Sequence, residues 1–132
     1  MAVMPPWSAV STSVRDWVAS VVQPITGHLA TLETPSWYAR FAAQLMTDPV
    51  LRDLIVDDAV GSPAFRHVHA TSSRHLPDLP AGVRAERNDM VRILVTHTCA
   101  ERERALADGA GTGWDDTAAA LIDAITGLLL AP

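Results

Sequence analysis

GVRAERNDMVRILVTHTCAERERALADG, residues 82–109, is the stretch that decides the fold of this chain. Its apolar residues recur three and four positions apart, which predicts one long amphipathic helix from Gly82 to Asp108. Gly109 is placed to end this helix, because glycine is the usual residue just beyond a helix C-terminus. By helical rise the helix is about 40 Å long, so it can serve as the axis against which other helices pack.

Two apolar stripes follow this predicted helix. The first carries Val83, Met90, Leu94 and His97, and the second carries Val91, Val95, Thr98 and Leu106. Two stripes imply two packing partners. The final turns, AERERALADG, are charged all round, so we expect that end to project into water or to lie over another subunit.

Helix-start signals divide the chain before this stretch. A helix is predicted from Ser13 to Leu32, where Ser13 and Asp16 have capping-box spacing and Pro24 should introduce a kink. A second helix should begin at ETPSW, with Thr34 as its cap and Pro35 in its first turn. Asp48 and Pro49 repeat this arrangement and open a short third helix, and GSP at 61–63 opens a fourth over about 63–75.

The last predicted helix opens at TGWDD, where Thr112 and Asp115 again have capping-box spacing. Its apolar face carries Leu121, Ile122, Ile125, Leu128 and Leu129. A neighbouring stripe of small residues, Ala120, Ala124 and Gly127, would let another helix approach closely. No segment alternates apolar and polar residues as a strand would. The sequence therefore predicts an all-α domain of about six helices over 13–132, after an N-terminal extension, 1–12, that is either disordered or the remnant of a linking helix.

Composition limits the environment of the protein. The chain has 132 residues, enough for one domain, and a formal net charge of -5, so no surface for DNA phosphates or anionic lipid is indicated. The single cysteine, Cys99, suits a reducing compartment. The N-terminal MAVMPPWSAV does not resemble a signal peptide, and no apolar run reaches the roughly 20 residues of a membrane span. These features predict a cytoplasmic protein, while the 48% hydrophobic content suggests that some apolar surface meets a partner.

Two residue pairs, His67 with His69 and His97 with Cys99, resemble metal-binding pairs. Residues two apart on a helix point about 200° away from each other, so one metal cannot be reached by both. We predict no metal, no cofactor and no catalytic residue, and interpret the histidines as partly buried packing residues. A tertiary site formed by His69 and His97, or a nucleophilic Cys99 beside His97, is the alternative.

Several stretches together resemble the C-terminal region of tetracycline-repressor-family (TetR/AcrR-type) transcriptional regulators. They are WYARFAAQLMTDPVLRDLI (37–55), SPAFRHVH (62–69), LPDLPAGVRAER (76–87), MVRILVTHTCAERERALADG (90–109) and WDDTAAALIDAITGLLLAP (114–132). In that family an N-terminal helix-turn-helix unit binds DNA, and the following helical domain holds an inducer pocket and dimerises through its last two long helices. The helix-turn-helix unit is missing from this sequence, so the resemblance implies DNA contact only through a domain not present here.

The resemblance implies a homodimer in which the second stripe of the long helix and the apolar face of the last helix form a four-helix bundle with a two-fold mate. The predicted interface residues are Val95, Thr98, Arg102, Leu121, Ile125, Leu128 and Leu129. The predicted pocket for a small apolar or aromatic effector is lined by Trp17, Trp37, Phe41, Leu45, Phe65, His69, Met90, Leu94 and His97.

Two other functions remain open at this point. The chain could be a truncated interaction module that forms mixed dimers with a full-length regulator. It could also be a small helical enzyme that depends on a metal or on a Cys/His pair.

Overall fold

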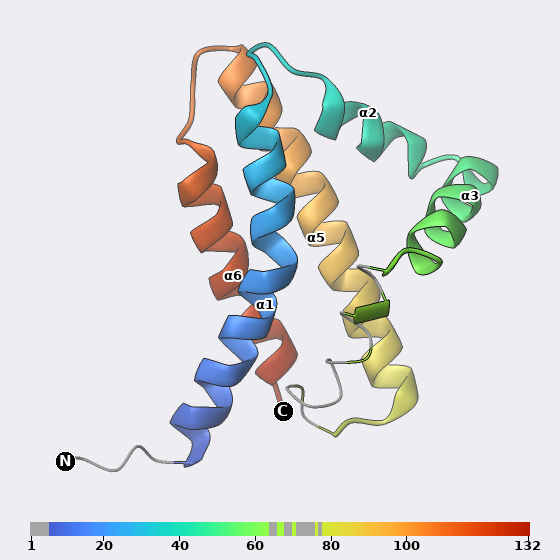
Figure 1. The fold of residues 1–132 in the computed structure, drawn as a ribbon, viewed down its shortest axis with the longest axis vertical. Helices are drawn as coiled ribbons and strands as arrows, with labels where there is room; N and C mark the ends of the chain where they lie inside the picture. Colours follow the sequence, from blue (N-terminus) through green and yellow to red (C-terminus); the bar gives the residue numbers. More distant parts are fainter. Residues whose placement is uncertain (1–5, 64–65, 68–69, 71–75, 77) are drawn as a thin grey trace.

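The computed structural model of the chain describes residues 6–63, 66–67, 70, 76 and 78–132 (Figure 1). The helices with complete bounds in this part are α1 (Pro6–Thr31), α2 (Tyr38–Leu45), α3 (Pro49–Val60), α5 (Ala81–Ala107) and α6 (Trp114–Leu130). No described residue lies in a strand, so the all-helical prediction is confirmed for that part. Of the predicted helix over 63–75, Pro63, Arg66, His67 and Ala70 are helical and the rest lies outside the described residues.

Three long helices form the body of the molecule. α6 packs against both α1 and α5, and α2 packs against α5 (Figure 1). The buried core comes mainly from α1 and α6, and every member is at most 8% exposed: Val14, Val18, Val22, Leu29, Ala39, Cys99, Leu121, Ile122, Ile125 and Leu129. The α1 members Val14, Val18 and Val22 are four residues apart, so they form one ridge along the helix.

Threonines complete this core without leaving a buried hydroxyl unsatisfied. Thr126 Oγ1 donates to the carbonyl oxygen of Ile122 at 2.6 Å, and Thr26 and Thr117 bond to carbonyls four residues earlier in the same way. Because each hydroxyl is satisfied within its own helix, its burial carries little desolvation penalty.

Two predicted helix ends are confirmed. Asp48 Oδ1 accepts hydrogen bonds from the backbone N–H of Val50 (2.9 Å) and of Leu51 (3.0 Å), so it caps α3 as expected. Gly109 follows α5 with φ +73°. The backbone N–H of Gly109 donates to the Leu106 carbonyl and that of Ala110 to the Ala105 carbonyl, which is the Schellman arrangement.

Three predicted helix starts are different in the structure. α1 begins at Pro6 rather than at Ser13, so the proposed boundary at 12/13 falls inside a helix. α2 begins at Tyr38, after a cis Thr34–Pro35 bond, and not at Thr34. α6 has Gly113 at its N-cap with no side-chain cap, so Thr112 does not cap it. Local capping residues did not predict the start of α2 correctly, because a side chain from a distant part of the chain caps its N-terminus, as described below.

α2 and α3 extend away from the body as an arm, which we define as residues 37–58. Figure 1 shows α2 leading outward from the end of α1 and α3 lying farthest from α1 and α6. Every described α3 side chain, from 49 to 58, is exposed to solvent. None of the helices in the described part of the chain combines the length and apolar character that a bilayer crossing demands.

Candidate functional site

A buried carboxylate on α5 holds the start of α2. Glu103 is only 3% exposed, and its Oε2 accepts hydrogen bonds from the backbone N–H of Ala39 (2.9 Å) and from Ser36 Oγ (3.1 Å). Its Oε1 accepts from the backbone N–H of Arg40 (3.0 Å) and from Arg40 Nε (3.3 Å). The carboxylate therefore supplies the N-terminal cap that α2 lacks in its own sequence, at the positive end of the helix dipole. We call this group the Glu103 clamp.

The clamp keeps Glu103 ionised. Burial by itself would raise the pKa of this carboxyl, but the backbone N–H groups of Ala39 and Arg40 and the side chains of Ser36 and Arg40 outweigh it and lower the pKa below its ordinary value. Arg40 is fixed in turn, because its Nη2 donates to the Ser36 carbonyl (2.6 Å) and its guanidinium carbon lies 3.6 Å from the centre of the Trp37 ring.

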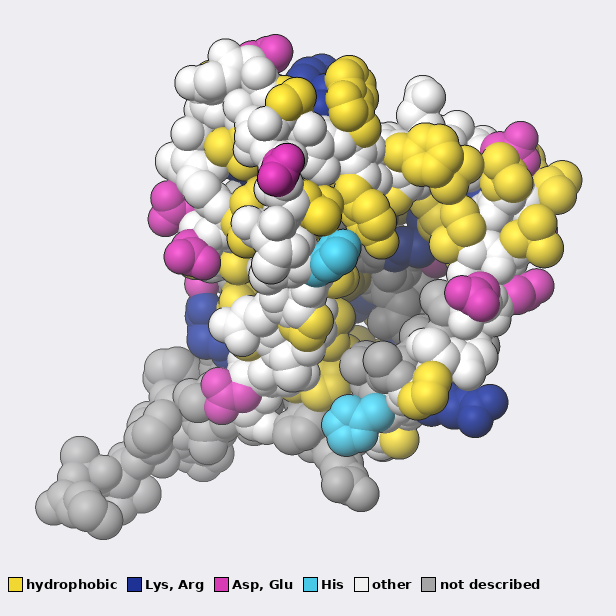
Figure 2. Space-filling model, turned by 45° about the horizontal axis from the view of Figure 1, so that its top comes forward, with side chains coloured by type: hydrophobic (Ala, Val, Ile, Leu, Met, Phe, Trp, Pro, Cys, Tyr) yellow, Lys and Arg dark blue, Asp and Glu magenta, His cyan; other side chains and the backbone are white. Residues whose placement is uncertain are grey.

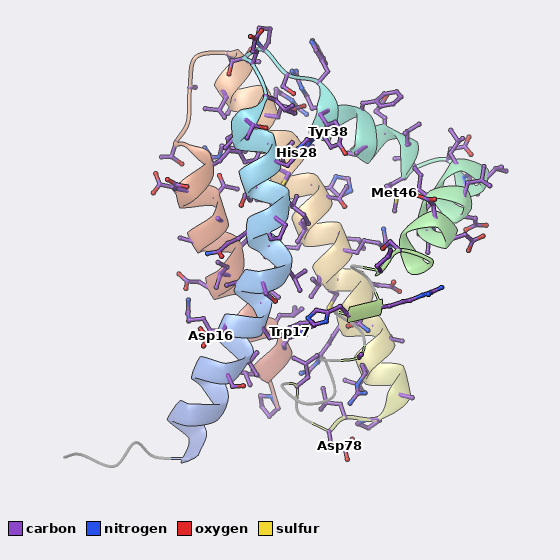
Figure 3. The ribbon with its side chains drawn as sticks, viewed as in Figure 1. Asp16, Trp17, His28, Tyr38, Met46 and Asp78 are labelled. Carbon is purple, nitrogen blue, oxygen red and sulfur yellow. The ribbon has the colours of Figure 1, made fainter. Side chains whose placement is uncertain are left out.

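An apolar pocket of about 160 Å³ lies beside the clamp. Three helices line it: Ile25 and Leu29 from α1, Tyr38, Ala39 and Ala42 from α2, and Val95, Thr96 and Cys99 from α5. Small alanines on the inner face of α2 let the helix backbone approach α5. The Tyr38 ring at the start of α2 meets the His28 ring of α1 edge to face, with centroids 5.2 Å apart (Figure 3).

The chemistry of this pocket favours a small neutral guest. Burial, and then the negative charge of Glu103, raise the pKa of the Cys99 thiol to about 11, so at neutral pH it is a protonated thiol and a poor nucleophile. An apolar cavity of about 150 Å³ is known to admit benzene, whereas drug-sized ligands occupy roughly 300–1,000 Å³. The volume therefore fits a single ring or a short branched hydrocarbon.

The structure places the predicted pocket residues elsewhere. Trp17 and Leu94 are half-buried against the core, and Leu45 is half-buried on α2. The exposed members are Trp37 (66%), Phe41 (63%), Met90 (49%) and His97. Phe65 and His69 lie outside the described residues. None of the seven described members lines the pocket.

The predicted residues do not line the pocket because α2 and α5 are rotated about their axes relative to the expected orientation. The aromatic ridge of α2, which we expected to face inward, points into solvent, and the alanine face meets α5. On α5 the stripe expected to face the pocket includes exposed Met90 and His97, while Val91 and Val95 from the other stripe pack against the core. The observed pocket is lined by α1, α2 and α5, and none of its lining side chains belongs to the predicted set.

The predicted dimer residues are also distributed differently. Leu121 (2% exposed), Ile125 (2%) and Leu129 (5%) are buried against α1 within one chain, so this packing leaves no apolar α6 ridge free for a mate. Val95 lines the pocket, and Thr98, Arg102 and Leu128 are half-buried. The helix that covers α6 is α1, which the predicted interface did not include.

Sequence reasoning missed the clamp entirely. Glu103 lies within the charged run ERER, which we expected to project into water or to lie over another subunit. Nothing local distinguishes Glu103 from exposed Glu101, because the donors that make its burial favourable lie more than 60 residues earlier in the chain. A second side chain of α5 also bonds to the backbone at the end of another helix. Arg87 Nη1 donates a hydrogen bond to the carbonyl oxygen of Leu129 (3.2 Å) near the C-terminus of α6.

His97 and Cys99 do not form a joint site. Cys99 is buried, but His97 is exposed rather than partly buried as predicted, because the two residues lie about 200° apart on the helix. Within the described residues, no group of three His, Cys, Asp or Glu side chains is arranged to hold a metal ion. A site that includes His69 falls outside the described part of the chain.

Neither a protein-family profile, nor a curated protein, nor a solved structure matches the chain. The pocket, the clamp and the exposed surfaces are therefore the basis for assigning a function.

Proposed function

We propose that this chain is a ligand-sensing domain of the kind that forms the C-terminal part of tetracycline-repressor-family regulators. Its effector is a small neutral apolar or single-ring aromatic molecule, bound in the pocket between α1, α2 and α5. The observation that carries this proposal is an apolar pocket lined by three helices, one of which, α2, is held at its start by a buried carboxylate of α5. The resemblance noted in the sequence supports the same class of protein.

Binding would be reported through α2. A guest that fills the space beside Ala39 and Ala42 contacts α2 and α5 at once, so it has different affinities for arrangements in which these helices lie closer together or farther apart. Such differential affinity is what shifts a conformational equilibrium. Because α2 continues into α3, a small change at the clamp moves the arm.

Thermal shift with benzene, toluene and phenol tests the pocket. A ligand present at about 100 times its Kd stabilises the folded state by about 2.7 kcal/mol and raises the melting temperature. Ala42→Leu places extra methylenes in the pocket and should abolish the shift, whereas Ala119→Leu, at an exposed position of α6, should leave it unchanged. Equal shifts in both variants, or none with the unmodified protein, would contradict the proposal.

A second part of the proposal is self-association through a different face of α6. Ala120, Ala124 and Gly127 are exposed, and a Cβ added at Gly127 would meet no atom within 4 Å. This small-residue face allows close approach of a helix from a second copy, or from a full-length relative in a mixed dimer. In sedimentation experiments at micromolar concentration we expect a dimer that Ala124→Arg dissociates. A monomer at every concentration would refute self-association but would not affect the pocket.

A further inference from the structure

The arm exposes an unusual amount of apolar surface. Its exposed side chains and their exposed fractions are Trp37 (66%), Tyr38 (58%), Phe41 (63%), Val50 (68%), Leu51 (40%), Leu54 (61%) and Ile55 (37%). Figure 2 shows hydrophobic side chains of both arm helices gathered on one visible face of the molecule. We call this set the arm patch.

The area of the arm patch is large enough for a specific interface. With about 150–250 Å² for each fully exposed large side chain, the fractions above correspond to on the order of 700 Å². The largest apolar patch on an ordinary monomer is about 300–600 Å², and a stable complex buries about 800 Å² on each partner. The arm patch therefore has the size of one half of a protein interface.

The spacing of the arm patch suits a helical partner. Trp37 and Phe41 are four residues apart on one side of α2, and Leu51, Leu54 and Ile55 have the i, i+3, i+4 spacing of a ridge on α3. Ridges of this kind accept the side chains of another helix between them. An amphipathic helix is the usual occupant of such an apolar surface.

The charges around the arm patch select among partners. Asp48, Asp53, Asp57 and Asp58 are exposed on α3 or at its start, and carboxylates flank the hydrophobic side chains in Figure 2. Arg52 is an exposed cation on α3 and exposed Arg66 follows that helix, whereas Arg40 of α2 is held by Glu103. The rim is thus acidic, which repels nucleic acid, anionic lipid and the equally acidic rim of a second copy.

We propose that the arm patch binds an amphipathic helix of a partner protein whose apolar face is flanked by arginine or lysine. Burial of Trp37, Phe41 and Leu54 supplies the affinity, since large aromatic and aliphatic side chains dominate such interfaces. Asp53, Asp57 and Asp58 supply the selectivity through the basic flanks. This proposal does not depend on the effector pocket.

Two synthetic helical peptides test the proposal by calorimetry with the full chain. Both carry leucine at i, i+3, i+4 and i+7 positions, and one is flanked by arginine while the other is flanked by glutamate. We expect the arginine peptide to bind at least tenfold more tightly, with an affinity that falls as salt is added. Equal binding of the two peptides, or none, would overturn the proposal.

Variants locate the site. Leu54→Glu should weaken binding of the arginine peptide at least tenfold. Ile93→Glu, at a similarly exposed position of α5, should leave that binding unchanged. Asp57→Lys with Asp58→Lys should reverse the preference toward the glutamate peptide, and circular dichroism checks that each variant remains helical. The proposal fails if Leu54→Glu instead dissociates a dimer of this chain, or if anionic phosphatidylglycerol vesicles bind the chain and the arginine peptide does not.

Discussion

The body and the arm are both built from α-helices, but they bury their apolar residues very differently. In the body, Val14, Val18, Leu121 and Ile125 are at most 2% exposed. In the arm, Phe41 and Leu54 are more than 60% exposed, although both lie in α-helices. Periodicity therefore identifies a helix and its apolar face, but it does not say what covers that face.

The attachment of the two regions differs as well. Hydrophobic burial holds α1 and α6 together, whereas α2 meets α5 through alanines and one carboxylate. Apolar burial is spread over many residues, while a clamp concentrates its contribution in a few directional bonds. We therefore expect the attachment of the arm to depend more on one side chain than the packing of the body does.

The largest expected effect separates body from arm directly. Ile125→Ala removes buried methylenes and leaves a cavity, so it should lower the free energy of unfolding by about 2–5 kcal/mol. Leu54→Ala, a similar truncation at an exposed site, should change it by less than about 0.5 kcal/mol. Urea unfolding measures both. Comparable losses would mean that the arm is buried in solution.

The clamp should give the next largest effect. Glu103→Gln keeps the shape of the side chain but replaces one acceptor oxygen with an NH2 donor that faces the donors of α2, which should cost about 1–3 kcal/mol. The matched control is Glu101→Gln, two residues earlier, where the carboxylate is exposed and paired with Arg104 at the surface. That change should cost less than about 1 kcal/mol. If the two variants were equally stable, Glu103 would not hold α2.

Acid should release the same clamp. The pKa of Glu103 is below its ordinary value of 4.5 in the folded protein, so its contribution to stability is complete above about pH 4.5 and is lost as pH falls through the lowered pKa. The difference in unfolding free energy between the unmodified chain and Glu103→Gln should therefore shrink in acid. Urea titrations over a pH series would reveal it. A constant difference at all pH values would argue against ionised Glu103 as the cause.

Two glycines give smaller effects of opposite sign. Gly111 has φ +88°, and a Cβ there would lie 2.5 Å from Arg102 Nη1, so Gly111→Ala should cost about 1–2 kcal/mol. Gly127→Ala, within α6 and with no atom near the added Cβ, should stabilise the monomer by about 0.5–1 kcal/mol. Melting temperatures of the two variants should move in opposite directions. A lower melting temperature for Gly127→Ala would indicate that another group covers this face of α6.

The surface ion pair between α1 and α6 should matter least. Arg15 and Asp123 form a salt bridge with both side chains about half exposed or more, so Arg15→Ala should cost less than about 1 kcal/mol. A double-mutant cycle with Asp123→Ala in low and high salt isolates the pair. A coupling insensitive to salt would contradict a solvent-screened interaction.

Much of the fold could be predicted from the sequence, because its signals are local. The bounds of α5 were predicted within one residue, since helical periodicity runs up to Gly109 and glycine permits the left-handed turn that follows. Asp48 and Pro49 marked the start of α3 for the same reason. The site was less predictable. Tyr38 and Cys99 became pocket residues through the rotation of two helices, and no spacing rule determines that rotation.

By itself, the amino-acid sequence determined that the described chain is helical, where α3 begins and where α5 begins and ends, because caps, glycines and periodic apolar residues act over a few positions. Only the tertiary structure decided which faces of α2 and α5 turn inward, that α1 covers α6, and that Glu103 is buried. These outcomes depend on donors and apolar surfaces brought together from distant parts of the chain, and the free energy of such contacts exists only once the helices have packed.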